Sequence, residues 1–237
     1  MKAPRRHPFR PLHDLWRILL PHLCIHCGEP LVGDEQDLCT QCLMQTAWLT
    51  TDTAEENTIG RRLAGRIPFE AAAALMAFRK DTVVQSVVHH IKYYHNTRLA
   101  AQYGRLMGEM LIASGRFAEV DCLVPVPLHP LKHLRRGYNQ SQLLCEAIAH
   151  VMHLPIESHT LYRRRYTQTQ THKNHQERQD NMQGVFALRH PERLAGKHIL
   201  LVDDIVTTGA TTTACYDALA AIPGLHISIA TLAVAAD

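Results

Sequence analysis

The chain has 237 residues, of which 46% are hydrophobic and 20% are charged, and its formal net charge is +3 at pH 7. This composition supports a buried core and excludes a disordered polymer, while so small a charge does not by itself indicate a nucleic-acid partner. No apolar run approaches the ~20 residues of a membrane helix, and Arg17 and Pro21 break the one weakly apolar N-terminal stretch, so we expect a cytoplasmic protein without membrane insertion.

The N-terminal third differs in character from the rest of the chain. Residues 1–20 predict a basic arm with a short amphipathic helix, because leucines and Trp16 recur there at helical spacing. Residues 21–48 contain paired cysteines, and residues 49–66 are polar and typical of a linker. We therefore expect residues 67–237 to form the main domain.

Strands and helices alternate in this predicted main domain. The expected strands are 71–78, 121–127, 198–202 and 227–234. The expected helices are 82–94, 99–114, 139–152 and 211–221. Residues 162–183 are polar and aperiodic, which predicts a long loop. This alternation is typical of an α/β fold with a parallel sheet flanked by helices.

The segment after the strand 198–202 has the character of a phosphate-binding loop. Two acids, Asp203 and Asp204, precede a turn that contains Thr207, Thr208 and Gly209 and leads into a helix. A turn of small residues at a helix N-terminus offers backbone N–H groups to a phosphate.

The residues available to this loop also point to its ligand. The segment continues with Ala210 and Thr211, and threonine hydroxyls add donors. Two carboxylates repel a bare phosphate, but they suit the hydroxyls of a ribose 5-phosphate with Mg²⁺ nearby.

Other interpretations of this loop fit less well. A Walker loop requires a lysine that is absent here, and no G-x-G-x-x-G fingerprint is present. In a response-regulator domain the acid-bearing strand opens the domain, whereas here it lies close to the end of the chain. A simple helix cap needs one such residue, not two acids and several threonines.

The cysteines predict a structural metal site. Cys24 and Cys27 form one C-x-x-C pair, Cys39 and Cys42 form a second, and eleven residues separate the pairs. Two such pairs supply the four thiolates of a tetrahedral zinc ion and leave no open position. A redox motif would use one pair, and the other three cysteines do not suggest a disulfide framework.

Four parts of the chain together resemble the ComF family of competence-associated proteins with a phosphoribosyltransferase fold. They are Cys24–Cys27 with Cys39–Cys42, Asp121–His129 followed by Arg135–Ser141, Arg165–Gln170, and Val202–Thr211. The resemblance implies a type I phosphoribosyltransferase-like sheet with a small N-terminal zinc module. It also implies that Asp203 and Asp204 hold the ribose of 5-phosphoribosyl-1-pyrophosphate (PRPP), and that residues 207–211 hold its 5-phosphate.

The resemblance further implies positions for the pyrophosphate and for a loop that closes over the substrate. Candidate contacts are Lys92, Arg135, Arg136, Arg165, Gln170 and Arg178. The implied activity is transfer of the phosphoribosyl group to an unidentified acceptor, with Mg²⁺ as cofactor and a role in DNA uptake.

A second hypothesis remains open beside this one. Basic clusters at residues 2–10, 132–136 and 163–165, together with the zinc module, favour a protein that senses PRPP or handles single-stranded DNA without turnover. Its partners would be single-stranded DNA and the DNA-uptake machinery.

Overall fold

The computed structural model describes residues 22–49, 58–165 and 184–236. The chain forms two compact units, Met1–Thr46 and Ala47–Asp237. In the described part of the first unit, Leu23 bridges Pro30 and the short helix α2 spans Thr40–Met44. Few of its side chains are buried hydrophobics, so its apolar core is small.

The second unit is built on a four-stranded parallel sheet. Its strands are β1 (Ala72–Phe78), β2 (Cys122–Pro125), β5 (His198–Val206) and β6 (His226–Ala235). Their order is β1-β6-β5-β2, so β5 lies in the interior of the sheet between β6 and β2. The strands are rich in buried apolar residues because both faces of the sheet are covered.

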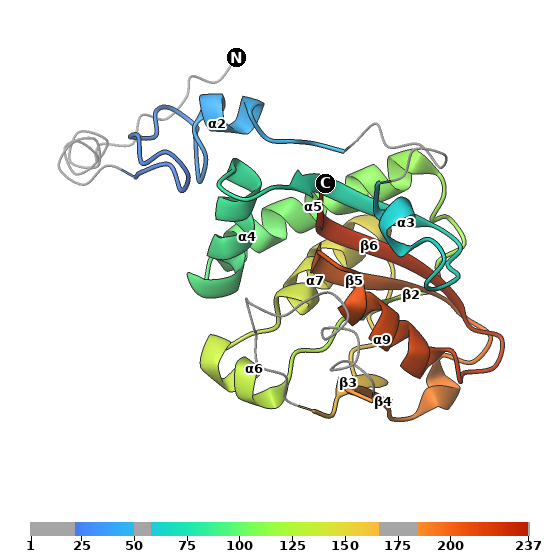
Figure 1. Cartoon of the computed structure of the whole chain (residues 1–237). Helices are drawn as coiled ribbons and strands as arrows, with labels where there is room; N and C mark the ends of the chain where they lie inside the picture. Colours follow the sequence, from blue (N-terminus) through green and yellow to red (C-terminus); the bar gives the residue numbers. More distant parts are fainter. Residues whose placement is uncertain (1–21, 50–57, 166–183, 237) are drawn as a thin grey trace, which may run out of the picture. The chain divides into compact units, whose positions relative to one another are not determined.

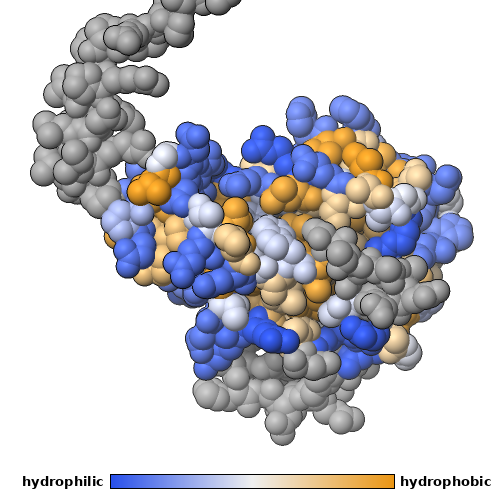
Figure 2. All heavy atoms as spheres, turned by 90° about the horizontal axis from the view of Figure 1, so that it is seen from above, coloured by the Kyte–Doolittle hydropathy of each residue, from blue (hydrophilic) through white to orange (hydrophobic). Residues whose placement is uncertain are grey.

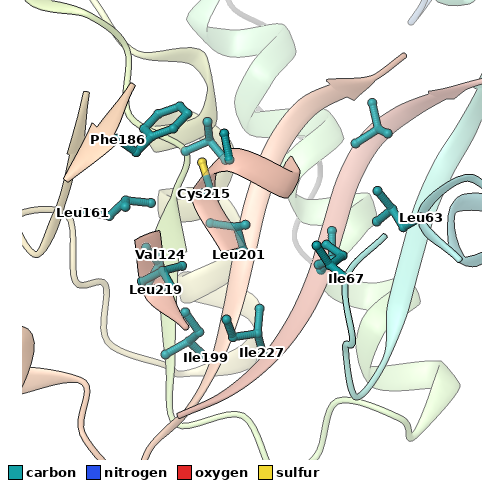
Figure 3. Close-up of a cluster of buried hydrophobic side chains, with 14 of the residues drawn as sticks. Leu63, Ile67, Val124, Leu161, Phe186, Ile199, Leu201, Cys215, Leu219 and Ile227 are labelled. Atoms are coloured by element: carbon teal, nitrogen blue, oxygen red, sulfur yellow. The ribbon is translucent and has the colours of Figure 1, made fainter. Parts of the chain in front are cut away.

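Helices cover the two faces of this sheet (Figure 1). The described helices of the unit are α3 (Thr58–Leu63), α4 (Val83–Tyr93), α5 (Thr97–Ser114), α6 (Pro130–Arg136), α7 (Gln140–Met152) and α9 (Ala210–Leu219). One core joins α3 and α9 to the sheet and to an antiparallel hairpin of β3 (Leu161–Arg163) and β4 (Phe186–Leu188), as Figure 3 shows. The helices α4, α5 and α7 pack on the sheet with their own buried faces, and a 3₁₀ turn, η1, spans Pro191–Arg193.

Two glycines allow α5 and α7 to lie unusually close together. A Cβ atom at Gly104 would lie 2.6 Å from the Cβ of Ala147, and one at Gly108 would lie 2.9 Å from that of Val151. Such distances are well inside van der Waals contact, so larger residues would push the helices apart. Because α7 begins at the functional site, this contact helps to fix the position of its first turn.

The structure confirms the α/β class and the parallel sheet, and it differs from the sequence prediction in several places, among them the unpredicted helix α6. The strand β5 runs to Val206 and so contains both acids, because its backbone pairing with β6 continues beyond Val202. Residues 58–63, within the expected linker, form α3, whose Ile59 and Leu63 enter the core. The stretch 162–183 was expected to be loop, but its start belongs to the β3–β4 hairpin.

The described surface mixes polar and apolar side chains, as Figure 2 shows for one face. Within the described ranges, none of the helices combines the length and the apolar character required to cross a bilayer. Exposed large hydrophobic side chains of the second unit include Tyr93 and Tyr94 at the end of α4, and Leu131 and Leu134 on α6.

Candidate functional site

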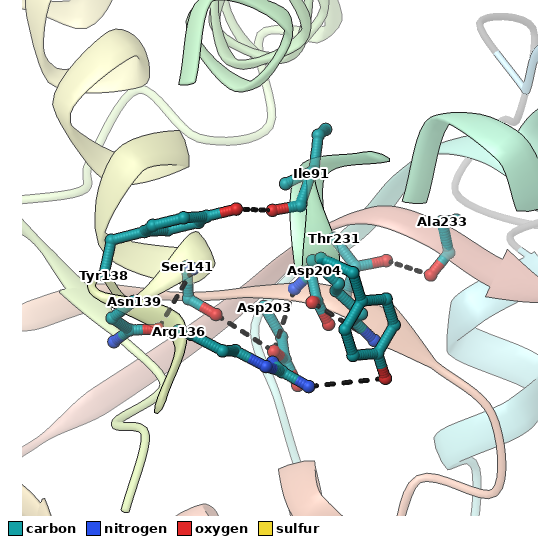
Figure 4. A network of polar contacts seen from close by, with 11 residues as sticks. Ile91, Arg136, Tyr138, Asn139, Ser141, Asp203, Asp204, Thr231 and Ala233 are labelled. Atoms are coloured by element: carbon teal, nitrogen blue, oxygen red, sulfur yellow. Dashed lines mark hydrogen bonds and ion pairs between the residues drawn. The ribbon is translucent and has the colours of Figure 1, made fainter. Parts of the chain in front are cut away.

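The carboxyl end of β5 carries the two acids at the centre of the candidate site. Asp203 and Asp204 are both buried, with 8% and 4% of their surface exposed. Oδ1 of Asp203 accepts hydrogen bonds from Oγ of Ser141, at 3.1 Å, and from the backbone N–H of Asp204, at 2.8 Å (Figure 4). In open parallel sheets, ligands bind at this edge.

Burial and mutual repulsion shape the charge of this acid pair. Burial and the neighbouring Asp204 together raise the pKa of Asp203 to about 7, although Lys92 and the hydrogen bonds to Asp203 act in the opposite direction. The ammonium of Lys92, on α4, lies 3.2 Å from Oδ2 of Asp204. The site therefore holds one carboxylate paired with a cation beside another that titrates near neutrality.

The loop after β5 turns sharply into α9. Gly209 has φ +81°, which favours glycine, and a Cβ there would also lie 2.9 Å from Cδ2 of Leu63. The guanidinium of Arg66 donates a hydrogen bond to the carbonyl of Thr208, and this bond helps to fix the conformation of the turn.

The first turn of α9 leaves backbone donors at the loop. The N–H of Ala210 reaches Oγ1 of Thr208 at 3.4 Å, and the N–H of Thr213 reaches the carbonyl of Gly209 at 2.8 Å. In the described part of the chain, no carbonyl acceptor is found for the N–H groups of Thr211 and Thr212. Such donors at a helix N-terminus suit an anion.

The segment Gly137–Ser141 connects α6, α4 and β5. Gly137, with φ +79°, ends α6, and the hydroxyl of Tyr138 donates to the carbonyl of Ile91 at the end of α4. Asn139 caps α7 and donates to the carbonyl of Val126, at 3.0 Å, after β2. Ser141 donates to Asp203 on β5, so this short segment is hydrogen-bonded to α4, to the end of β2 and to β5 (Figure 4).

Four cations lie close enough to influence one another, and two of them also interact with the acids. Burial and the nearby charges of Arg163, Arg136 and Lys92 together lower the pKa of Lys132 to about 8. Arg163 comes from β3, with its guanidinium 5.4 Å from the centre of the Phe186 ring. Asp203 is near enough to oppose the lowering of the pKa of Arg163 that burial causes.

The structure brings together only some of the predicted site residues. Lys92 pairs with Asp204, next to Asp203, and Arg136 lies against Tyr93, the residue after Lys92, whereas Arg135 and Arg165 are exposed. Gln170 and Arg178 lie outside the described residues. Sequence reasoning did not assign Lys132 or Arg163 to the site, because both belong to basic clusters that also fit a solvated surface.

The four paired cysteines form a second cluster, in the first unit. The Sγ atoms of Cys24, Cys27, Cys39 and Cys42 all lie within 4.8 Å of one another, and those of Cys27 and Cys39 are 3.7 Å apart. Sulfur atoms at ~2.3 Å from one tetrahedral zinc ion lie ~3.8 Å apart.

Local hydrogen bonds hold these four thiols together. The N–H of Gly28 reaches the carbonyl of Cys24 at 3.0 Å, Gly28 has φ +78°, and Cys39 caps α2. The carboxylate of Glu35 accepts hydrogen bonds from the N–H groups of Val32 and Thr40, and these bonds stabilise the loop between the two cysteine pairs. The cluster therefore fits a single tetrahedral metal ion.

Comparison with known proteins supports the fold of the second unit and identifies relatives of the chain. Residues 143–236 match the family model of the phosphoribosyl transferase domain. The chain is 30% identical over 205 residues to DNA utilization protein YhgH of Salmonella typhi, a match that covers 82% of this chain and 88% of that protein. It is 32% identical over 92 residues to competence protein F of Haemophilus influenzae, covering 38% of this chain and 40% of that protein.

A solved structure was also found to be similar. Glutamine phosphoribosylpyrophosphate (PRPP) amidotransferase from B. subtilis is 17% identical, with a TM-score of 0.36, and the match covers 60% of this chain and 30% of that one.

Proposed function

We propose that this chain, which belongs to the ComF family of phosphoribosyltransferase-like proteins, binds PRPP at the carboxyl end of β5. One observation carries the proposal. Two adjacent buried carboxylates, one of them paired with Lys92, open directly into a threonine–glycine loop at the N-terminus of a helix. A ribose 5-phosphate needs carboxylates that accept hydrogen bonds from its hydroxyls, directly followed by N–H and O–H groups that donate to its phosphate. Few other ligands need both in succession.

Each part of the site then has a role. Asp203 and Asp204 accept the ribose 2′- and 3′-hydroxyls, and the backbone N–H groups and hydroxyls of residues 207–211 bind the 5-phosphate. Mg²⁺ would be held mainly by the pyrophosphate and water, near the same carboxylates.

The cations would hold the pyrophosphate at the other end of the ribose. Lys92 pairs with Asp204, and Arg163, Arg136 and Lys92 all lie close enough to act on the charge of Lys132, so we assign these four cations this role in preference to Arg135. When the bond from C1 to pyrophosphate breaks, negative charge accumulates on the leaving oxygen, and fixed cations stabilise it. We retain Arg165, Gln170 and Arg178 as proposed contacts of a loop over the substrate.

The names of the relatives lead us to place this activity in the use or uptake of DNA. A protein named DNA utilization protein aligns with 82% of this chain, and one named competence protein F aligns with 38% of it. We propose single-stranded DNA and the DNA-uptake machinery as partners, in the cytoplasm. A PRPP sensor without turnover is the second candidate, and release of pyrophosphate from PRPP distinguishes the two.

For the first unit we propose one structural zinc ion on Cys24, Cys27, Cys39 and Cys42. The described part of the unit buries few apolar side chains, so a metal ion would supply much of its folding free energy. Four protein ligands leave no position for substrate, which makes the role structural.

The carboxylate assignment is tested by calorimetry with PRPP and Mg²⁺. The Asp203→Asn/Asp204→Asn variant loses two charge-assisted acceptors, so we expect its affinity to fall by roughly 100-fold or more. Asp217→Asn, an exposed acid on α9, is the matched control and should bind as the unaltered protein does. Equal affinity of the double variant and the control contradicts the ribose assignment.

A further inference from the structure

A buried hydroxyl on α7, that of Ser141, contacts the acid pair. Ser141 is 2% exposed, and its Oγ lies 3.1 Å from Oδ1 of Asp203 (Figure 4). The same carboxylate oxygen accepts a hydrogen bond from the backbone N–H of Asp204, at 2.8 Å. Because a carboxylate oxygen has two lone pairs, these two donors occupy Oδ1. A proton on this carboxyl, or a hydrogen bond from a ligand, is therefore directed to Oδ2.

Neighbouring hydrogen bonds fix the position of this hydroxyl. The backbone N–H of Ser141 donates to Oδ1 of Asn139, at 3.2 Å, and the side-chain amide of Asn139 donates to the carbonyl of Val126, at 3.0 Å. The helix α7 itself packs closely against α5. Since the serine and its helix are both held in place, the hydroxyl is directed at Asp203 before any ligand binds.

Several charged and titratable groups act on Asp203 together with this hydroxyl. In the described part of the chain, those that interact with it are Asp204 on β5, Lys92 on α4, Arg163 on β3, Cys145 on α7 and Cys215 on α9. Burial raises the pKa of both thiols well above its ordinary value, so neither carries a charge. Burial and Asp204 oppose the charge of Asp203, whereas Lys92 and the two hydrogen bonds to Oδ1 favour it. Because the resulting pKa is about 7, this carboxyl changes its charge near neutrality.

We propose that Ser141 is a positioning residue, whose hydroxyl holds Asp203 as an ionised acceptor with Oδ2 left for the ligand and so sets the pH range in which the ribose hydroxyls bind. The inference rests on the proposed function for the identity of the ligand. It adds a regulation of that site, because binding strengthens as Asp203 loses its proton. A protonated carboxyl is a donor at Oδ2 and offers a ribose hydroxyl no charged acceptor there.

The strength of one hydrogen bond sets the size of the expected effect. Loss of a hydrogen bond to a charged acceptor raises the pKa of a buried carboxyl by about one unit. A rise of that size from the present value of about 7 lowers the ionised fraction of Asp203 at pH 7 from roughly one half to roughly one tenth. We therefore expect Ser141→Ala to bind PRPP about fivefold more weakly at pH 7 and almost equally well at pH 9.

The test is a calorimetric titration of the full chain with PRPP and Mg²⁺ at several values between pH 6 and pH 9. The 5-phosphate of PRPP also titrates near pH 6, but its contribution cancels when variants are compared at one pH. If Ser141→Ala binds too weakly to be titrated, its melting temperature without ligand gives the same information. Its destabilisation relative to the unaltered protein should then grow as the pH rises above 7, because the folded state retains the proton of Asp203 to a higher pH.

Two further variants separate this role from a general loss of structure. Ser228→Ala is the matched control, because Ser228 is fully buried on β6 and its Oγ lies 2.8 Å from Nε2 of His198, at the start of β5. This variant removes a comparable hydroxyl away from the acids, so its stability should fall while its pH profile stays in place. Ser141→Thr keeps a hydroxyl on the same carbon, so its midpoint should match that of the unaltered protein even if the added methyl group lowers the melting temperature.

The outcomes distinguish this inference from the proposed function. An upward shift of the binding midpoint in Ser141→Ala, absent from Ser228→Ala and Ser141→Thr, supports the role of Ser141. Binding of PRPP with the same midpoint in Ser141→Ala and the unaltered protein overturns this role and retains the proposed function. An equal shift in Ser141→Ala and Ser228→Ala overturns it as well. If the unaltered protein binds no PRPP at any of these pH values, the proposed function fails and this inference fails with it.

Discussion

The ammonium of Lys92 lies 3.2 Å from Oδ2 of Asp204, and this ion pair joins α4 to the carboxyl end of β5. Both side chains are largely buried, at 19% and 6% exposed, so solvent screens the pair only partly. Lys92 therefore compensates the charge of the buried Asp204 carboxylate, which lies where we propose that ribose hydroxyls bind.

Removing the cation should destabilise the protein. Lys92→Met leaves a buried carboxylate without its ion pair, which is expected to reduce the free energy of unfolding by about 3 kcal/mol. Urea denaturation at pH 8 measures the loss. Lys80→Met, at an exposed position, is the control, and adding Asp204→Asn to Lys92→Met should recover much of the loss. A double variant no more stable than Lys92→Met would refute the ion-pair argument.

Stability should depend on pH through Asp203. Its folded pKa of about 7 lies above the ordinary value of 3.8, so the native state retains a proton that the unfolded chain has lost. This carboxyl therefore lowers stability progressively as pH rises from about 4 to about 7, and its full penalty is present above that range.

Asp203→Asn removes this penalty but keeps the oxygen that accepts from Ser141. We expect the variant and the unaltered protein to melt at similar temperatures at pH 4, and the variant to melt several degrees higher at pH 8. About 1 kcal/mol corresponds to ~2–4 °C in a chain of this size. Thermal unfolding at the two pH values provides the measurement, and a constant difference between them would show that Asp203 does not titrate in this range.

The turn at Gly209 should tolerate no side chain. Gly209→Ala combines an unfavourable φ with a contact of 2.9 Å to Leu63, so we expect both the melting temperature and the affinity for PRPP to fall. Gly196→Ala is a matched control, because Gly196 has φ +67° and no atom within 4 Å of an added Cβ. If the two variants lose the same stability, of about 1 kcal/mol, the contact with Leu63 has no effect.

Zinc content tests the first unit. We expect one zinc ion per chain by elemental analysis and its loss in Cys24→Ser/Cys39→Ser, because two thiolates cannot complete a tetrahedral site. Cys145→Ala, a buried cysteine of α7, should retain the metal. A folded, unaltered protein that contains no zinc would contradict the assignment.

The sequence predicted the class of the fold because short apolar segments alternate with helical ones along the main domain. It also located the acids and the loop, since both lie within one contiguous segment. It could not predict that Arg163 joins them, because β3 has three residues and pairs with a strand more than twenty residues away. The helix α6 was missed for a related reason: it has no buried residue, so it shows no apolar periodicity.

The sequence also could not predict that these cations lie close to one another. Lys132 and Arg136 follow β2, Lys92 ends α4, and Arg163 belongs to β3, so their proximity depends on the strand order. By contrast, Arg135 is adjacent to Arg136 in sequence but is exposed. Consecutive residues of a helix point in different directions, which explains the difference.

The most direct test of PRPP binding is calorimetric titration of the unaltered protein with PRPP, with and without Mg²⁺. The proposed site predicts Mg²⁺-dependent binding in the micromolar range, which corresponds to roughly −8 kcal/mol. Absence of heat and of any thermal shift at millimolar PRPP would contradict it, and would mean that the fold serves another ligand.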